Sequence, residues 1–186
     1  MGKLVYSTVQ SLDGYIADEN GDFGWAAPDE ELHGLVNDIE RDTGTMLLGR
    51  RTYEILKVWD TFGADDSEPE VIQDFHRIWK GADKIVYSRT LDSVDSERTR
   101  LEGEFDVAAV RELKESADRD LTIGGPALAS HALAAGLVDV LNIYVVPAII
   151  GGGLRALPDG VRLNLALADQ RRTASGALVL RYDVQD

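Results

Sequence analysis

The amino-acid sequence predicts an α/β protein with a mostly parallel sheet, antiparallel strands at one edge and helices on both faces. Up to Gly136, short apolar runs alternate with segments of helical periodicity, which is typical of parallel sheets. Beyond it, residues 163–167 and 178–184 alternate in polarity with period two and have no helical pattern between them, which predicts an antiparallel pair. The 186 residues contain no internal repeat and no linker, so we expect a single domain over residues 1–186.

Composition excludes several classes of function. The net charge of -14 argues against nucleic acid as a partner, because phosphate binding needs a clustered basic surface. The chain has no cysteine, which rules out disulfides and thiolate metal sites, and its three histidines lack ligand spacing, so we expect no metal. No apolar run approaches the roughly 20 residues of a membrane helix, and the N-terminus resembles a strand rather than a signal peptide. We therefore expect no membrane association and a cytoplasmic location.

The first predicted strand covers residues 3–10 and leads through Asp13 into a long polar loop. Such a loop at the carboxyl edge of a sheet is where open α/β folds bind ligands. A helix then begins within residues 28–31, with apolar positions at helical spacing. Its acidic first turn has two interpretations. The acids stabilise the helix N-terminus, or one of them, or His33 one turn further on, orients a proton at a substrate.

The next strand, residues 45–48, ends directly in Gly49-Arg50-Arg51-Thr52 at the start of a helix. Two arginines at a helix N-terminus are disfavoured by the helix dipole, and a bound phosphate would reverse that sign. The pattern therefore predicts an anion site at this turn.

A second turn of this kind follows an amphipathic helix that begins at Pro69 and a strand over residues 84–87. It consists of Ser88, Arg89 and Thr90. Arginine can pair with two phosphate oxygens and serine can donate to a third, so this turn suits a phosphomonoester. A later helix has Asp106 as its predicted cap.

The third turn, Gly124-Gly125, joins a buried strand to a helix that begins at Pro126. Glycines without Cβ atoms permit close backbone approach, and a helix N-terminus attracts anions. A tight connection without a ligand is the alternative interpretation. If the turn holds a phosphate, we expect valine at Gly124 or Gly125 to abolish binding while the protein still folds.

Four segments occur in a characteristic order: SLDGYIA, LLGRRTYE, IVYSRTL, and LTIGGPALASHAL followed by LVDVLNIYVVPAIIGGG. With them the chain resembles the dihydrofolate reductase-like superfamily and, more closely, its branch related to the C-terminal reductase domain of bifunctional riboflavin-biosynthesis enzymes. The resemblance covers nearly the whole chain. It implies a three-layer α/β/α fold, NADPH as cofactor and a homodimer.

The resemblance also implies a set of cofactor contacts. The pyrophosphate would lie on Gly124, Gly125, Pro126 and Ala127. The second dinucleotide turn would be Gly49, Arg50, Arg51 and Thr52. The adenosine 2′-phosphate would be held by Ser88 and Arg89. The nicotinamide would lie beside Val9, Ile16 and Ala17, flanked by Ile150 and Gly151.

Dihydrofolate reductases place a carboxylate near the start of the first helix, where this chain offers Glu30 or Glu31. The candidates for the catalytic polar group are therefore Asp13, Glu31 and His33. The predicted function is an NADPH-dependent reductase of a small heterocyclic, pterin- or pyrimidine-like, or carbonyl substrate. The alternative is an NADP(H)-binding sensor or subunit of the same fold without reductase activity.

Overall fold

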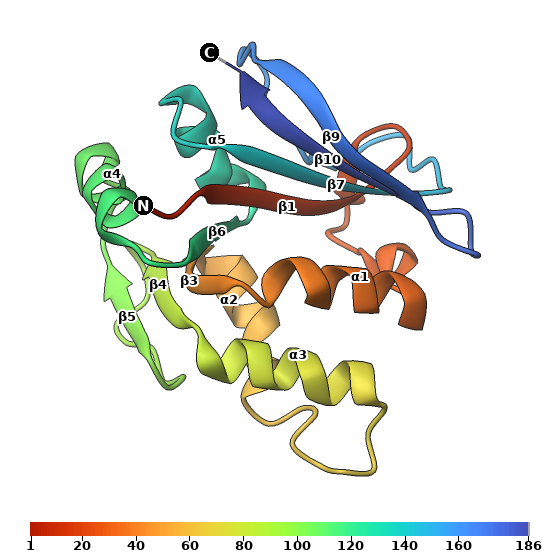
Figure 1. Ribbon diagram of the computed structural model, residues 1–186, viewed down its shortest axis with the longest axis horizontal. Coiled ribbons are helices and arrows are strands. Elements are labelled where there is room, and N and C mark those ends of the chain that lie inside the picture. Colours follow the sequence, from red (N-terminus) through yellow and green to blue (C-terminus); the bar gives the residue numbers. More distant parts are fainter. Residues whose placement is uncertain (186) are drawn as a thin grey trace.

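The computed structural model describes residues 1–185, and an eight-stranded sheet of order β5-β4-β3-β6-β1-β7-β10-β9 forms its centre (Figure 1). The parallel strands are β1 (Leu4–Ser11), β3 (Thr43–Gly49), β4 (Asp83–Tyr87), β5 (Thr99–Glu102), β6 (Asp120–Gly124) and β7 (Val140–Val146). The antiparallel strands are β9 (Asn164–Arg172) and β10 (Leu178–Gln185). The predicted fold class is confirmed. A separate two-stranded sheet, β2 (Tyr15–Ala17) with β8 (Leu154–Arg155), was not anticipated from the sequence.

Helices cover both faces of the sheet and complete a three-layer arrangement (Figure 1). The first three, α1 (Glu30–Glu40), α2 (Arg50–Leu56) and α3 (Glu70–Gly81), lie on one face together with the short 3-10 helix η2 (Lys57–Asp60). The opposite face carries α4 (Val107–Ser116) and α5 (Pro126–Ala134). A second 3-10 helix, η1 (Gly24–Ala26), interrupts the loop before α1. Asp29 and Asp106 cap α1 and α4 with their side chains, as their positions in the sequence predict.

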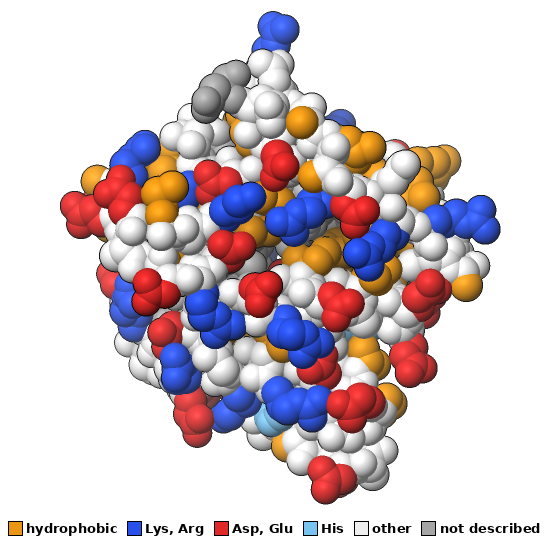
Figure 2. Space-filling model, in the orientation of Figure 1, with side chains coloured by type: hydrophobic (Ala, Val, Ile, Leu, Met, Phe, Trp, Pro, Cys, Tyr) orange, Lys and Arg blue, Asp and Glu red, His pale blue; other side chains and the backbone are white. Residues whose placement is uncertain are grey.

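Acidic and basic side chains are interspersed over the face of the molecule seen in Figure 2. A negatively charged ligand of this acidic protein must therefore rely on individual arginines and on backbone N–H groups. Among the helices in residues 1–185, none has the length and apolar character that crossing a bilayer requires.

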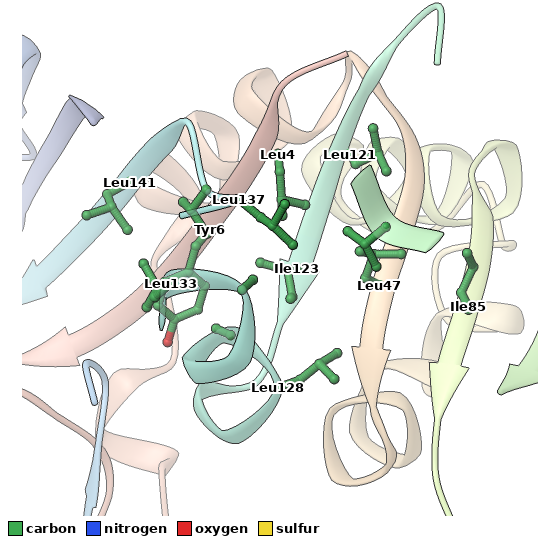
Figure 3. Packing of buried hydrophobic residues seen from close by; sticks show 14 residues of the cluster. Leu4, Tyr6, Leu47, Ile85, Leu121, Ile123, Leu128, Leu133, Leu137 and Leu141 are labelled. Atoms are coloured by element: carbon green, nitrogen blue, oxygen red, sulfur yellow. The ribbon is translucent and has the colours of Figure 1, made fainter. Parts of the chain in front are cut away.

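The larger core lies between the sheet and the α4 and α5 layer. Side chains that alternate along the strands, such as Leu4, Leu47 and Ile123, point from one face of the sheet toward Leu128 and Leu133 of α5 (Figure 3). All of them are at least nine-tenths buried. The small residues of α5 allow it to pack closely on the centre of the sheet.

The opposite face of the sheet has two smaller apolar clusters. One surrounds the fully buried Trp79 of α3, and the other places Leu32 of α1 against Tyr144 and Val146 of β7. The strands at the centre of this face carry polar side chains between the two clusters. The innermost part of the candidate site, described below, lies at this polar region between the two apolar clusters.

Candidate active site

A cleft of about 1600 Å³ opens at the carboxyl ends of β1, β3, β4 and β6. These strands are parallel, so their carboxyl ends meet at one edge. The chain enters the sheet at β1 and later returns to insert β6 between β3 and β1, and open sheets bind ligands at such crossover points. A pocket for one small molecule measures about 300–1,000 Å³, so this cleft has room for a dinucleotide beside a second molecule.

The cleft gathers almost all of the residues that the sequence assigned to the cofactor. They line it in the order Val9, Ile16, Ala17, Gly49, Arg50, Arg51, Thr52, Ser88, Arg89, Gly124, Gly125, Pro126 and Ala127. The remaining two, Ile150 and Gly151, do not line it. Three turns far apart in the sequence therefore meet in one place, which is the arrangement that the motif order predicts.

Gly124 and Gly125 of the third turn are required to be glycines because they pack closely against the second turn. A Cβ on Gly124 would lie 3.0 Å from Cδ2 of Leu48 and 3.1 Å from Cγ2 of Thr52. Gly125 has a φ of +95°, and a Cβ there would lie 2.5 Å from Oγ1 of Thr52. Side chains at these positions strain the backbone or displace Thr52. We therefore expect valine at Gly125 to lower stability as well as to affect binding.

The turn at Ser88 is already ordered by its own hydrogen bonds. The Ser88 hydroxyl oxygen accepts from the backbone N–H groups of Thr90 and Leu91, both at 3.1 Å. Arg89 is exposed, and its guanidinium lies 3.8 Å from the exposed carboxylate of Glu104. Exposed ion pairs of this kind contribute about 0–1 kcal/mol, so a phosphate can readily replace Glu104 as the partner of Arg89.

Asp13 serves as an anchor for the glycine loop after β7. Its carboxylate accepts hydrogen bonds from the backbone N–H groups of Ile150 at 3.1 Å and Gly151 at 2.7 Å. Hydrogen bonds from the Ser11 side chain and from these amides lower the pKa of Asp13 to about 2. Asp13 is thus ionised at neutral pH and cannot donate a proton. The same contacts hold Ile150 and Gly151 against Asp13, away from the cleft.

Glu31 and His33, the other two candidate catalytic residues, also make contacts outside the cleft. Glu31 accepts a hydrogen bond of 2.7 Å from the backbone N–H of Ala174 in the turn between β9 and β10. The buried His33 ring lies with its centroid 5.7 Å from those of Trp59 and Phe75, and burial lowers the pKa of its imidazole. Asp13, Glu31 and His33 therefore support the structure around the cleft and do not line it.

Among the acidic residues that line the cleft, Glu40, the last residue of α1, is buried, whereas Asp18, Glu19 and Glu104 are exposed or half-buried. The sequence interpretation missed Glu40. Glu40 is 8% exposed and accepts a hydrogen bond of 3.2 Å from Oγ1 of Thr43. Burial raises the pKa of Glu40, and hydrogen bonds from Thr43, Ser7 and Thr122 offset this only in part.

A signal for Glu40 was present in the sequence. Leu32, Val36 and Glu40 are spaced by four residues, so Glu40 occupies the apolar stripe of α1. It also stands in the last turn of the helix, where the dipole disfavours a negative charge. Both the apolar surroundings and the C-terminal end of the helix disfavour a negative charge at this position. A carboxyl group kept in such a position is a candidate functional residue.

Three further polar residues join Glu40 at the inner end of the cleft: Ser7 of β1, Thr122 of β6 and Tyr144 of β7. We call these four residues the inner polar cluster. Tyr144 is 1% exposed, and its hydroxyl has no hydrogen-bond partner among residues 1–185. Burial and the nearby Glu40 raise the pKa of Tyr144. Because buried polar groups are normally paired, a free hydroxyl facing a cleft indicates a place for a ligand or water.

Histidine and acidic side chains within residues 1–185 form no group of three that could hold a metal ion. The polar groups of the site are instead arginines, backbone amides and the hydroxyl-rich inner polar cluster. Together with the parallel sheet, these groups define an α/β protein with a large ligand-binding cleft at the carboxyl edge of its sheet. The chain belongs to the RibD C-terminal domain family, whose model matches residues 2–179.

Other proteins are similar to this chain in sequence or in fold. The uncharacterised protein YyaP of Bacillus subtilis (strain 168) is 24% identical over 184 residues, which cover 97% of this chain and 94% of YyaP. Among solved structures, the Thermotoga maritima diaminohydroxyphosphoribosylaminopyrimidine deaminase/5-amino-6-(5-phosphoribosylamino)uracil reductase matches with a TM-score of 0.69 and 20% identity. That match covers 99% of this chain and 57% of the Thermotoga protein. Enterococcus faecalis dihydrofolate reductase, in complex with NADP(H), matches with a TM-score of 0.61 and 16% identity over 100% of this chain and 98% of its own.

Proposed function

We propose that this protein is an NADPH-dependent reductase of a small heterocyclic, pterin- or pyrimidine-like, or carbonyl substrate. The observation that carries the proposal is the meeting of three separate turns, with three glycines and three arginines, in one cleft that ends in the inner polar cluster. Membership of the RibD C-terminal domain family supports it, as does the fold shared with a dihydrofolate reductase that binds NADP(H).

The residues of the cleft fit the parts of this cofactor. Arg89, with Ser88 beside it, is exposed and held only by a weak ion pair, so it is available for the 2′-phosphate. The amide groups at the start of α5 lack helical partners and lie at the cleft, where they would bind the pyrophosphate. Val9, Ile16 and Ala17 supply an apolar surface for the nicotinamide and exclude water from it. NADPH, when bound, supplies the hydride.

The test is the cofactor preference of an Arg89→Ala variant, measured by calorimetric titration with NADPH and with NADH. An arginine–phosphate contact contributes about 1.5–3 kcal/mol, so we expect roughly a 10- to 150-fold loss for NADPH and little change for NADH. Lys57→Ala, which removes an exposed cation outside the cleft, is the matched control. Equal losses for both cofactors would show that Arg89 does not bind the 2′-phosphate.

A second candidate function is an NADP(H)-binding sensor or subunit without reductase activity. One observation favours it: the three residues predicted to be catalytic, Asp13, Glu31 and His33, do not line the cleft. Oxidation of NADPH in the presence of pterins, pyrimidines and small carbonyl compounds separates the two functions. Binding of NADPH without turnover of any of these compounds would favour the sensor.

We also propose that the protein forms a homodimer through β9, the outermost strand of the sheet. Every residue of β9 is exposed, and Leu165 and Leu167 on it are 42% and 51% exposed. An edge strand with exposed leucines is a typical surface for pairing with a second copy. Light scattering should show a dimer that Leu167→Lys converts to a monomer and that Ile149→Lys, in a loop elsewhere, leaves intact. A monomeric wild-type protein would contradict this.

A further inference from the structure

The connection between β4 and β5, residues 88–98, begins with the Ser88–Arg89 turn and contains neither helix nor strand. Neighbouring parallel strands such as β4 and β5 are usually joined through a helix that packs on the sheet. This irregular segment depends instead on its own side-chain contacts for its shape. Leu91 and Val94 supply the apolar contacts, because they pack against the cluster around Trp79.

Tyr53 of α2 supplies the polar contacts of this segment. The Tyr53 hydroxyl oxygen accepts hydrogen bonds from the backbone N–H groups of Asp95 and Ser96, both at 3.2 Å. The same hydroxyl donates to the carboxylate of Asp95 at 2.9 Å. A hydroxyl has one proton and two lone pairs, so the segment uses the full hydrogen-bonding capacity of Tyr53. Since Tyr53 is only 3% exposed, water cannot readily replace these bonds.

The segment is also connected to α3, through Ser96 and Asp60. The Ser96 hydroxyl donates to Oδ2 of Asp60 at 2.5 Å, and the indole N–H of the fully buried Trp79 donates to Oδ1 at 2.8 Å. Asp60 ends η2, which follows α2 directly. Tyr53, Asp60, Trp79, Asp95 and Ser96 therefore form one hydrogen-bonded set, which we call the Tyr53 network.

The Tyr53 network joins two of the turns that meet in the cleft. Gly49 lies opposite Tyr87 in the sheet, so the Gly49–Thr52 turn and the Ser88–Arg89 turn start side by side. Thr52 packs against the Gly124–Gly125 turn, and the next residue, Tyr53, holds the segment that follows Arg89. Two consecutive residues of α2 thus fix the position of both other turns.

The two nicotinamide cofactors differ in how much they depend on this spacing. NADPH carries a pyrophosphate and a 2′-phosphate, and both groups contribute fully only if the turns that hold them are correctly separated. NADH has no 2′-phosphate. We propose that Tyr53 is a positioning residue that raises the preference of the cleft for NADPH over NADH by holding the Ser88–Arg89 turn beside the Gly49–Thr52 turn. This inference rests on the proposed function and adds a determinant that does not itself line the cleft.

The test is calorimetric titration of full-length Tyr53→Phe with NADPH and with NADH. The substitution removes only the hydroxyl and leaves the N–H groups of Asp95 and Ser96 without their partner. We expect NADPH affinity to fall about 3- to 10-fold and NADH affinity to change less than about 2-fold. A loss of stability alone would not change the ratio of the two affinities.

Thr173→Val is the matched control. Thr173 is also buried, and its hydroxyl oxygen accepts a hydrogen bond of 3.1 Å from the backbone N–H of Ala177, in the turn between β9 and β10. Thr173 does not line the cleft. We expect a lower midpoint in thermal melts of Thr173→Val and the wild-type ratio of NADPH to NADH affinity.

A double variant tests whether Tyr53 acts through Arg89. Once Arg89 is alanine, Tyr53→Phe should weaken NADPH by less than about a further 2-fold, because the turn no longer has a phosphate contact to position. Ser96→Ala interrupts the same network more mildly, and we expect it to weaken NADPH alone by about 2- to 5-fold. Ser96→Ala decides the question if thermal melts show that Tyr53→Phe does not fold.

Equal losses of NADPH and NADH affinity in Tyr53→Phe, additive losses in the double variant, or wild-type NADPH affinity in both Tyr53→Phe and Ser96→Ala would overturn the proposal. These outcomes are distinct from failure of the proposed function. A wild-type protein that does not bind NADPH would refute the cofactor assignment together with the role of Tyr53. A wild type whose preference for NADPH is lost in Arg89→Ala but kept in Tyr53→Phe and Ser96→Ala would refute the role of Tyr53 alone.

Discussion

The two ends of the cleft are built on different physical principles. The outer end consists of turns with exposed arginines and closely packed glycines, so its ligand contacts come from backbone amides and solvated cations. The inner end consists of hydroxyl groups around the buried Glu40, whose pKa is raised by burial, and removal of water strengthens each hydrogen bond there. A change of side chain at the outer end should therefore alter binding alone, whereas a change at the inner end also alters the pH dependence of stability.

The glycine pair is the exception within the outer end, and it gives the largest expected effect. Gly125→Ala adds a Cβ at positive φ and against Thr52, so we expect the free energy of unfolding to fall by about 2–4 kcal/mol in chemical denaturation. Gly21→Ala is the matched control, because Gly21 has a φ of +83° with no atom within 4 Å of the added Cβ. A Gly125→Ala effect no larger than that of Gly21→Ala would show that contact with Thr52 contributes nothing.

The inner end of the cleft should alter the pH dependence of the free energy of unfolding. Because the pKa of Glu40 is raised on folding, its contribution to stability is complete below its unfolded value and is lost as the pH rises through the folded value. Within that window the wild type should lose about 1.4 kcal/mol of unfolding free energy per pH unit relative to Glu40→Gln. Parallel profiles for the two proteins between pH 4 and 8 would contradict a raised pKa of Glu40.

Asp13, which does not line the cleft, should have the opposite and weaker effect on the pH dependence of stability. Its folded pKa lies below the ordinary value, so its contribution is present above about pH 4 and is lost as the pH falls toward 2. We expect Asp13→Asn to accelerate amide hydrogen exchange at Ile150 and Gly151 while leaving the core strands protected. Faster exchange throughout the sheet would indicate that Asp13 supports the whole fold.

The smallest effect on stability is expected for the arginines of the second turn. Arg50 and Arg51 are exposed, so alanine at either position should change the unfolding free energy by less than about 0.5 kcal/mol. NADPH affinity should nevertheless fall in a salt-dependent way, because screening weakens contacts between exposed charges. Unchanged NADPH affinity in the Arg50→Ala, Arg51→Ala double variant would remove this turn from the cofactor site.

The outer end could be predicted from the sequence because each turn is a local pattern, and the parallel sheet brings the ends of such strands to one edge. The family resemblance predicted that Ile150 and Gly151 flank the nicotinamide, whereas in the structure neither lines the cleft and their amides donate hydrogen bonds to Asp13. The inner end was missed because Glu40 acquires its environment from β1, β6 and β7, which lie far from it in the sequence. Helical spacing could have singled out Glu40 but not its hydroxyl partners.

The contact of Thr52 with Gly124 and Gly125 has a consequence for how a cofactor would bind. Two turns that interlock through one side chain cannot reorient separately, so both are ordered when the protein folds. Little backbone freedom then remains to be lost on association. Binding at these turns should therefore be accompanied by little ordering of the protein backbone, and the glycines act on affinity through conformational entropy.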